Sequence, residues 1–292
     1  IHQDLNLEVR RGEILGVVGG SGTGKSVLMR SIIGLQEPVA GKIRVFDEGM
    51  IGKEEDEATD VRRRWGVLFQ GGALFSTLTV AENVQVPLRE FYPDFSKALL
   101  DEIAHYKIYL SGLPADAAHK FPSELSGGQV RRVAVARALA CEPRVIVADE
   151  SVAGLDVSVQ AQLLNLLRDL QREQRIALVF VTHDLGVAGY LCEHVAVMYL
   201  GRIVEMGPAE AVLQAPRHPY TRALMNAFPR FGTPLSVSLQ GEIPSPANLP
   251  SGCRFRTRCD RASGQCAEID PPQRVEGDRQ LACLHPHAAV WA

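Results

Sequence analysis

The sequence predicts an α/β fold with a mainly parallel core sheet, a helical subdomain and a small cysteine-containing C-terminal extension. The runs EILGVV, RVIVAD and IALVFVTHD are short, apolar and rich in β-branched residues, as buried parallel strands are. A glycine-rich loop follows the first run and leads into a helix-forming stretch. Because ligands bind at the carboxyl ends of parallel strands, we expect functional residues directly after these runs.

The first predicted strand leads into GGSGTGKS, which fits the phosphate-loop spacing G-x-x-x-x-G-K-S/T. Glycine permits positive φ and close backbone approach, and the helix that follows directs its positive end at the same point. Lys25 can reach the terminal phosphates of a nucleotide, and the Ser26 hydroxyl can join a magnesium shell. The residues expected to bind nucleotide are Gly19, Gly20, Ser21, Gly22, Thr23, Gly24, Lys25 and Ser26.

LSGGQ, before the helix-forming VRRVAVARALA, indicates a second anion-binding helix start. Ser126 is predicted to be its N-cap, and the two glycines after it expose backbone amides. With one phosphate loop in the chain, two copies that face head to tail could each complete the other's site.

The second and third predicted strands end in candidate catalytic residues. Asp149 and Glu150 stand side by side after RVIVA, where one carboxylate can hold magnesium and the other can orient the attacking water. His183 ends the third strand, so its imidazole could also face the nucleotide. Leucines at helical spacing between residues 157 and 174 predict an amphipathic helix packed on the sheet, and the acidic, then basic, stretch 47–65 predicts a surface hairpin or loop.

Composition restricts the class of protein. The chain has 292 residues, 46% of them hydrophobic, and a formal charge of −3, which argues against a nucleic-acid partner. It shows no apolar run of the roughly 18 to 20 residues that a membrane span needs, and no signal-peptide pattern, so we expect a cytosolic chain.

These motifs resemble those of the nucleotide-binding subunit of ATP-binding cassette (ABC) transporters, a P-loop NTPase family. In that family GGSGTGKS matches the Walker A loop, VIVADE the Walker B strand and LSGGQ the signature. VLFQGG matches the Q-loop, GLD the D-loop, and the His183 position the switch histidine.

The resemblance implies a mechanism in which ATP is held between the Walker A loop of one subunit and the signature of another. Glu150, His183, Gln70 and Lys25 are then catalytic, and Ser26, Gln70 and Asp149 hold magnesium. The residues implied to contact nucleotide across the subunits are Ser126, Gly127, Gly128, Gln129 and Asp156. The implied partners are transmembrane permease subunits, a second ABC ATPase subunit and, indirectly, a substrate-binding protein, at the cytoplasmic face of the inner membrane.

The two parts of the chain resemble different subfamilies. Residues 1 to about 125 look like ATPases of Mla (MCE) phospholipid transport systems, and residues from about 131 on look like oligopeptide and dipeptide importer ATPases. The domains expected are an ABC domain over 1–212, with its helical subdomain at roughly 71–140, and an importer-type extension over 213–292. Peptide import is the first hypothesis and phospholipid transport the second. A soluble ABC protein without a permease, or an inactive paralogue, is the alternative of another class.

Two positions depart from the family pattern. Ser151 follows the catalytic Glu where most members have Pro, so the loop loses a fixed φ. The sequence given begins 24 residues before Lys25, and the first strand and the aromatic residue that stacks on adenine are expected to be missing from it.

The extension carries a cluster of cysteines. Five, six and sixteen residues separate, in turn, Cys253, Cys259, Cys266 and Cys283. Four thiols so close in a cytosolic chain suggest an iron–sulfur cluster or zinc, and the extension of some peptide-importer ATPases is associated with a cluster. The alternative is free or structural thiols. The arginines of CRFRTRCDR are read as balancing the charge of a thiolate cluster rather than as a nucleic-acid or lipid patch.

Overall fold

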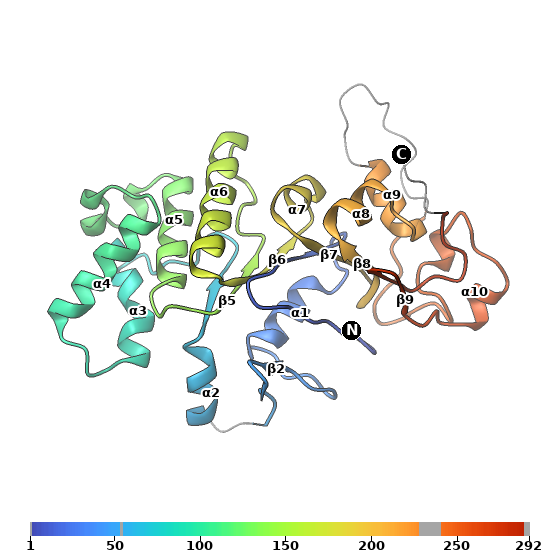
Figure 1. The fold of residues 1–292 in the computed structure, drawn as a ribbon, viewed down its shortest axis with the longest axis horizontal. Helices are drawn as coiled ribbons and strands as arrows, with labels where there is room; N and C mark the ends of the chain where they lie inside the picture. The colour runs from blue at the N-terminus through green and yellow to red at the C-terminus, as the bar shows by residue number, and fades with distance from the viewer. Residues whose placement is uncertain (1, 53–54, 228–240, 289–292) are drawn as a thin grey trace. The chain divides into compact units, whose positions relative to one another are not determined.

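The computed structural model describes residues 2–52, 55–227 and 241–288 (Figure 1). The chain divides into two compact units. Unit 1 comprises residues 1–9, 14–28 and 180–292, and unit 2 comprises residues 10–13 and 29–179. Both combine strands with helices, as the predicted α/β class requires.

Unit 1 is built on a ladder of strands. β1 (Ile14–Val18) pairs in parallel with β7 (His194–Tyr199), and β7 pairs antiparallel with β8 (Arg202–Pro208). β8 pairs with β10 (Arg279–Leu281), which pairs with β9 (Arg274–Glu276), both antiparallel. The C-terminal extension therefore contributes two strands to this ladder.

Helices and turns complete unit 1. After the last residues of β6 (Ala177–Thr182), which begins in unit 2, come the helices α7 (Leu185–Leu191), α8 (Ala209–Gln214) and, within the extension, α9 (Pro219–Ala227). The extension adds the short 3-10 helix η3 (Arg256–Arg258) and α10 (Gln265–Glu268). β1 is buried over its whole length, and Leu5, Leu7 and Val9 of the N-terminal segment pack on the cluster around Leu15.

Unit 2 holds a second parallel strand pair and most of the helices. β4 (Trp65–Leu68) pairs in parallel with β5 (Val145–Asp149). Three helices, α3 (Val80–Phe91), α4 (Lys97–Leu110) and α5 (Gly127–Ala138), bury one apolar cluster together with η1 (Ala115–His119), and lie side by side in Figure 1. The remaining short helix is η2 (Pro122–Glu124).

The long helix α6 (Val157–Gln174) has the predicted bounds, and it buries four of the five leucines of the predicted stripe. The stretch 47–65 differs in part from the prediction. It contains a strand of the hairpin β2 (Arg44–Val45) and β3 (Glu48–Gly49), but also the helix α2 (Glu55–Arg62) and the first residue of β4. α1 (Lys25–Ile32) begins in unit 1 and continues into unit 2.

None of the helices in the described ranges has the length and apolar character that a bilayer crossing needs.

Candidate nucleotide site

The predicted phosphate loop is the segment between β1 and α1. Gly19, Gly22 and Gly24 have φ angles of 155°, 74° and 106°, a region that L side chains rarely adopt. A Cβ on Gly19 would lie 2.3 Å from the carbonyl oxygen of Met198. Glycine is therefore required at Gly19 both by its φ and by the close approach of β7.

Lys25 is enclosed by this loop. Its side chain is buried, and Nζ donates to the carbonyl oxygens of Gly19 at 2.8 Å and Gly20 at 2.9 Å. The loop thus holds an ammonium group beside its own backbone at the start of α1, where the helix dipole adds positive potential. Ser26, the next residue, is exposed.

His183 follows β6 and is exposed. The backbone on both sides of it is fixed by local hydrogen bonds, because the Asp184 N–H donates to Thr182 Oγ1 at 3.0 Å and Asp184 N-caps α7. His183 and the phosphate loop are both in unit 1.

The two carboxylates lie where the sequence predicts them. Asp149 is the last residue of β5, and Glu150 follows it with a φ of 44°. A left-handed conformation at a glutamate costs about 1 to 2 kcal/mol, so the surrounding structure must impose it. The turn is closed by the Ala153 N–H, which donates to the Glu150 carbonyl oxygen at 3.0 Å, and Ser151 is buried within it.

Gln70 is exposed just after β4. The segment that follows is anchored on α5, because Arg137 donates to the carbonyl oxygens of Gly72 at 2.8 Å and Ala73 at 2.7 Å. Sequence reasoning missed Arg137, which is one of several arginines in a helical run with no spacing that marks it.

The signature forms the helix start predicted for it. Ser126 is the N-cap of α5 in a capping box, in which the Ser126 N–H donates to Gln129 Oε1 at 2.9 Å and the Gln129 N–H donates to Ser126 Oγ at 3.3 Å. A Cβ on Gly128 would lie 2.6 Å from Cγ1 of Val159 in α6. Asp156 is the N-cap residue of α6, is exposed and makes no side-chain capping bond.

The predicted site residues thus fall into two sets. Unit 1 contains the phosphate loop and His183, and unit 2 contains Gln70, the carboxylate pair, the signature and Asp156. Within each set the residues lie at strand ends or helix starts, which is where the sequence places them.

The four cysteines of the extension come together, all in unit 1. Cys253, Cys259, Cys266 and Cys283 line one small cavity with His218, Phe255 and two arginines. Burial raises the pKa of the Cys259 and Cys283 thiols to about 11. Among the described residues no group of three or more His, Cys, Asp or Glu side chains is placed to hold a metal ion.

The family model described as "ABC transporter" matches residues 2–153, and the model described as "Oligopeptide/dipeptide transporter, C-terminal region" matches residues 204–266. The chain belongs to the ABC transporter family. It is an ATP-binding and ATP-hydrolysing protein of that family, which uses ATP with Mg²⁺.

Curated relatives match nearly the whole chain. It is 41% identical to the oligopeptide transport ATP-binding protein OppF of Salmonella typhimurium, over 96% of this chain and 86% of that protein. It is 44% identical to the probable peptide ABC transporter ATP-binding protein y4tS of Sinorhizobium fredii, over 96% of this chain and 81% of the relative.

Among solved structures, the dimeric post-hydrolysis state of the ATP-binding cassette MJ0796 bound to ADP and phosphate matches with a TM-score of 0.66 and 32% identity. The match covers 71% of this chain and 90% of that one. The predicted fold, an ABC ATPase with a mainly parallel core sheet, is confirmed.

Proposed function

We propose that this chain energises the import of peptides across the cytoplasmic membrane. The observation that carries the proposal is the match of residues 204–266 to the oligopeptide/dipeptide transporter C-terminal region. It is supported by relatives named for oligopeptide or peptide transport that align over 96% of the chain. An alignment over 96% of the chain takes in most of the first 125 residues, so it favours peptides over the phospholipid alternative for that part as well.

In the proposed reaction, Lys25 and the amides of Gly19–Ser26 hold the β- and γ-phosphates of ATP. Bound magnesium would neutralise phosphate charge, and Ser26, Gln70 and Asp149 supply oxygen ligands of the kind it prefers. Glu150 orients and polarises the attacking water, while His183 and Gln70 contact the γ-phosphate. Each role positions a group or stabilises charge, which is how phosphoryl transfer is accelerated.

A second ATPase subunit completes each site. The helix start at Ser126, Gly127 and Gly128 presents backbone amides to an anion, and Gln129 holds its capping box together. Asp156 is exposed at the start of α6. We propose that these residues contact the nucleotide held by the phosphate loop of the partner.

The permease is proposed to dock on the helical subdomain, roughly residues 71–140 of a nucleotide-binding domain that spans 1–212. Aromatic side chains are exposed there, with Phe75 at 53% and Tyr109 at 75%. Exposed aromatic groups of this kind are typical of protein interfaces. Residues 213–292 are the importer-type extension, and the assembled subunit is peripheral on the cytoplasmic face of the inner membrane, near a substrate-binding protein that it does not contact directly.

The test is to purify the tagged full chain from gently solubilised membranes of its host and identify the co-purifying membrane proteins by mass spectrometry. Peptide-type permeases are expected. A tagged Lys25→Ala variant is the control, since docking does not need the phosphate loop. A phospholipid-type permease would overturn the peptide assignment, and recovery with no permease would favour the soluble class.

The cysteine cavity is proposed to hold an iron–sulfur cluster. Four thiols line it, which is the ligand set of [4Fe–4S] and [2Fe–2S] clusters. Several irons share the ligands of a cluster, so its cysteines stand farther apart than the four ligands of one tetrahedral ion. The four thiols around one cavity are the observation that supports the proposal. Arg256 and Arg261, which also line the cavity, would balance thiolate charge.

Anaerobic purification followed by iron, sulfide and zinc analysis tests this second proposal. Iron with acid-labile sulfide is expected in the wild type and in Cys141→Ser, whose thiol is outside the cavity, but not in Cys259→Ser. Zinc without sulfide would show that the cavity binds zinc instead of a cluster. Equal metal content in all three proteins would refute a metal role for these cysteines.

A further inference from the structure

Tyr220 joins the C-terminal part of the chain to the phosphate loop. It lies at the start of α9, is 2% exposed, and its hydroxyl oxygen accepts the Gly20 N–H at 2.9 Å. A Cβ on Gly20 would lie 3.4 Å from that oxygen, within van der Waals contact. An amide of the loop proposed to bind phosphate is thus fixed by a residue 200 positions away.

The ring of Tyr220 is held from several sides. It packs against Tyr199 at 4.6 Å and Phe255 at 5.4 Å between ring centroids. The Tyr220 N–H donates to Nδ1 of His218 at 3.0 Å, and His218 is itself buried. Fixing the ring fixes the hydroxyl, because a tyrosine has only two side-chain torsions.

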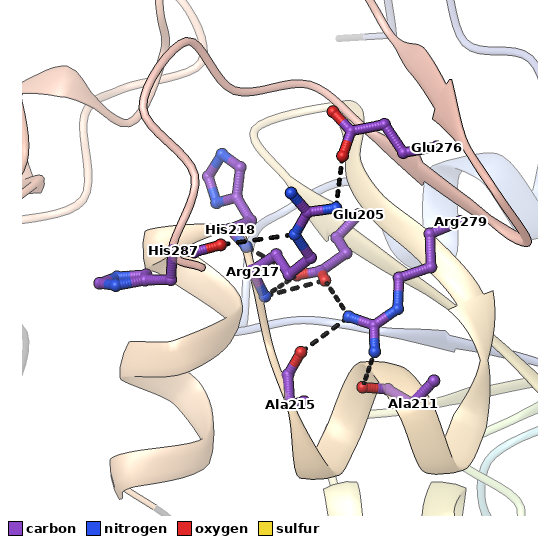
Figure 2. Close-up of polar contacts among 8 residues, drawn as sticks. All are labelled: Glu205, Ala211, Ala215, Arg217, His218, Glu276, Arg279 and His287. Carbon is purple, nitrogen blue, oxygen red and sulfur yellow. Dashed lines mark hydrogen bonds and ion pairs between the residues drawn. The ribbon is translucent and has the colours of Figure 1, made fainter. Parts of the chain in front are cut away.

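Next to His218 is a buried carboxylate. The backbone N–H groups of Arg217 and His218 donate to Glu205, at 3.0 Å and 2.9 Å, as Figure 2 shows. Arg279 of β10 contacts the same carboxylate at 3.4 Å. The backbone that carries Tyr220 is therefore anchored to β8 and, through Glu205, to β10.

A second route connects the extension with the loop. Arg254 donates to the carbonyl oxygen of Leu200 and, at 2.6 Å, to Oε1 of Gln3. The next residue along from Leu200 is Gly201, whose N–H donates to the carbonyl oxygen of Thr23 in the phosphate loop at 2.7 Å. The extension thus supports the loop at two points, and Phe255, which packs on Tyr220, also lines the cysteine cavity.

We propose that Tyr220 is a positioning residue of the nucleotide site, which fixes Gly20 and thereby couples nucleotide binding to the C-terminal extension. The proposal rests on the role proposed above for Gly19–Ser26 in holding phosphate. A loop already fixed in its binding conformation loses less freedom when the ligand arrives, so the Tyr220 contact raises nucleotide affinity. Coupling is reciprocal, so nucleotide must also stabilise the extension.

The test compares Tyr220→Phe with Tyr199→Phe in the full chain. Both remove one hydroxyl from the same aromatic cluster, but among the described residues only the Tyr220 hydroxyl is hydrogen-bonded to the phosphate loop. Calorimetry with Mg-ADP is expected to give a dissociation constant about 3- to 10-fold higher for Tyr220→Phe, the range of one lost hydrogen bond, and a near wild-type value for Tyr199→Phe.

Hydrogen exchange supplies a readout that general destabilisation does not move. In the wild type, Mg-ADP is expected to slow exchange in peptides from 253–266 as well as in the phosphate loop. Tyr220→Phe is expected to weaken the effect at 253–266 and to speed exchange in the nucleotide-free loop.

The outcomes separate this proposal from the one on which it rests. If Lys25→Ala binds Mg-ADP as the wild type does, the proposed role of the phosphate loop in nucleotide binding is contradicted. If Lys25→Ala loses binding while Tyr220→Phe and Tyr199→Phe behave alike in affinity and exchange, Tyr220 has no positioning role and the inference is overturned.

Discussion

Glu150 is the residue on which the proposed hydrolysis most depends. It follows Asp149 at the end of β5 in a left-handed conformation. We expect Glu150→Gln to bind ATP with near wild-type affinity and to hydrolyse it at least about 100-fold more slowly, because the amide keeps the shape but cannot accept a proton from water.

The measurement pairs equilibrium binding with single-turnover hydrolysis. Lys25→Ala is the contrasting variant, since it should lose affinity instead, having removed the ammonium that the loop encloses. Hydrolysis by Glu150→Gln at the wild-type rate would remove this residue from the catalytic role.

His218 makes the stability of the fold dependent on pH. Burial lowers the pKa of its imidazole from 6.5 to about 3, so it stays neutral in the folded chain while the unfolded chain takes up a proton below pH 6.5. The contribution of His218 to the free energy of unfolding is therefore at its full value above pH 6.5. It decreases by about 1.4 kcal/mol per pH unit as the pH falls from 6.5 toward 3. Unfolding by urea between pH 6.5 and 5 should therefore show a shallower pH dependence in His218→Gln, and equal slopes would contradict this prediction.

At the scale of elements, β10 is fastened to unit 1 through one arginine. Arg279 is 7% exposed, contacts the fully buried Glu205, and donates to the carbonyl oxygens of Ala211 at 2.5 Å and Ala215 at 2.7 Å. Figure 2 shows the guanidinium between the carboxylate and the end of α8. The guanidinium therefore pairs with the buried Glu205 carboxylate and also donates hydrogen bonds to the last carbonyls of α8.

We expect Arg279→Met to lower the free energy of unfolding by about 3 to 5 kcal/mol, because it leaves the buried Glu205 without its counter-charge. The control is Arg274→Met, on the exposed strand β9. Adding Glu205→Gln to Arg279→Met should recover part of the loss. Equal denaturation curves for the two single variants would show that the ion pair contributes little.

Elements with local signatures could be predicted from the sequence. The end of β5 at Asp149, the bounds of α6 and the Ser126 cap follow from β-branched runs, leucine spacing and a capping residue. α2 was missed because EDEATDVR has almost no apolar stripe to show a helical period.

The contacts that support the phosphate loop have no such signature. Tyr220 and Gly20 are 200 residues apart, and Glu205 and Arg279 are 74 apart. The pairing of β8 with β10 brings Glu205 beside Arg279, and the hydrogen bonds from Arg217 and His218 to Glu205 hold the backbone that carries Tyr220. The residues proposed for the site thus have local sequence signatures, whereas the contacts that support the phosphate loop depend on the folded topology.

For the whole molecule, the proposed completion of each site by a second subunit predicts that activity belongs to a pair of subunits. In the proposed dimer, each composite site takes its phosphate loop and Glu150 from one copy, and its signature from the other. A homodimer of Lys25→Ala and a homodimer of Ser126→Arg each have a defect in both of their sites. Mixed in equal amounts, however, they form some dimers in which both defects fall in the same site and the other site is intact.

We therefore expect this mixture to regain about a quarter of wild-type ATPase activity. Random pairing makes half of the dimers heterodimers, and each heterodimer has one intact site of its two. A mixture of Lys25→Ala with Glu150→Gln is the matched control, because its mixed dimers carry one defect in each site and should stay inactive. Recovery in both mixtures would mean that Lys25 and Glu150 of one copy serve different sites. Recovery in neither, with pairing confirmed by ultracentrifugation in ATP, would require sites made within single copies or with a different partner chain.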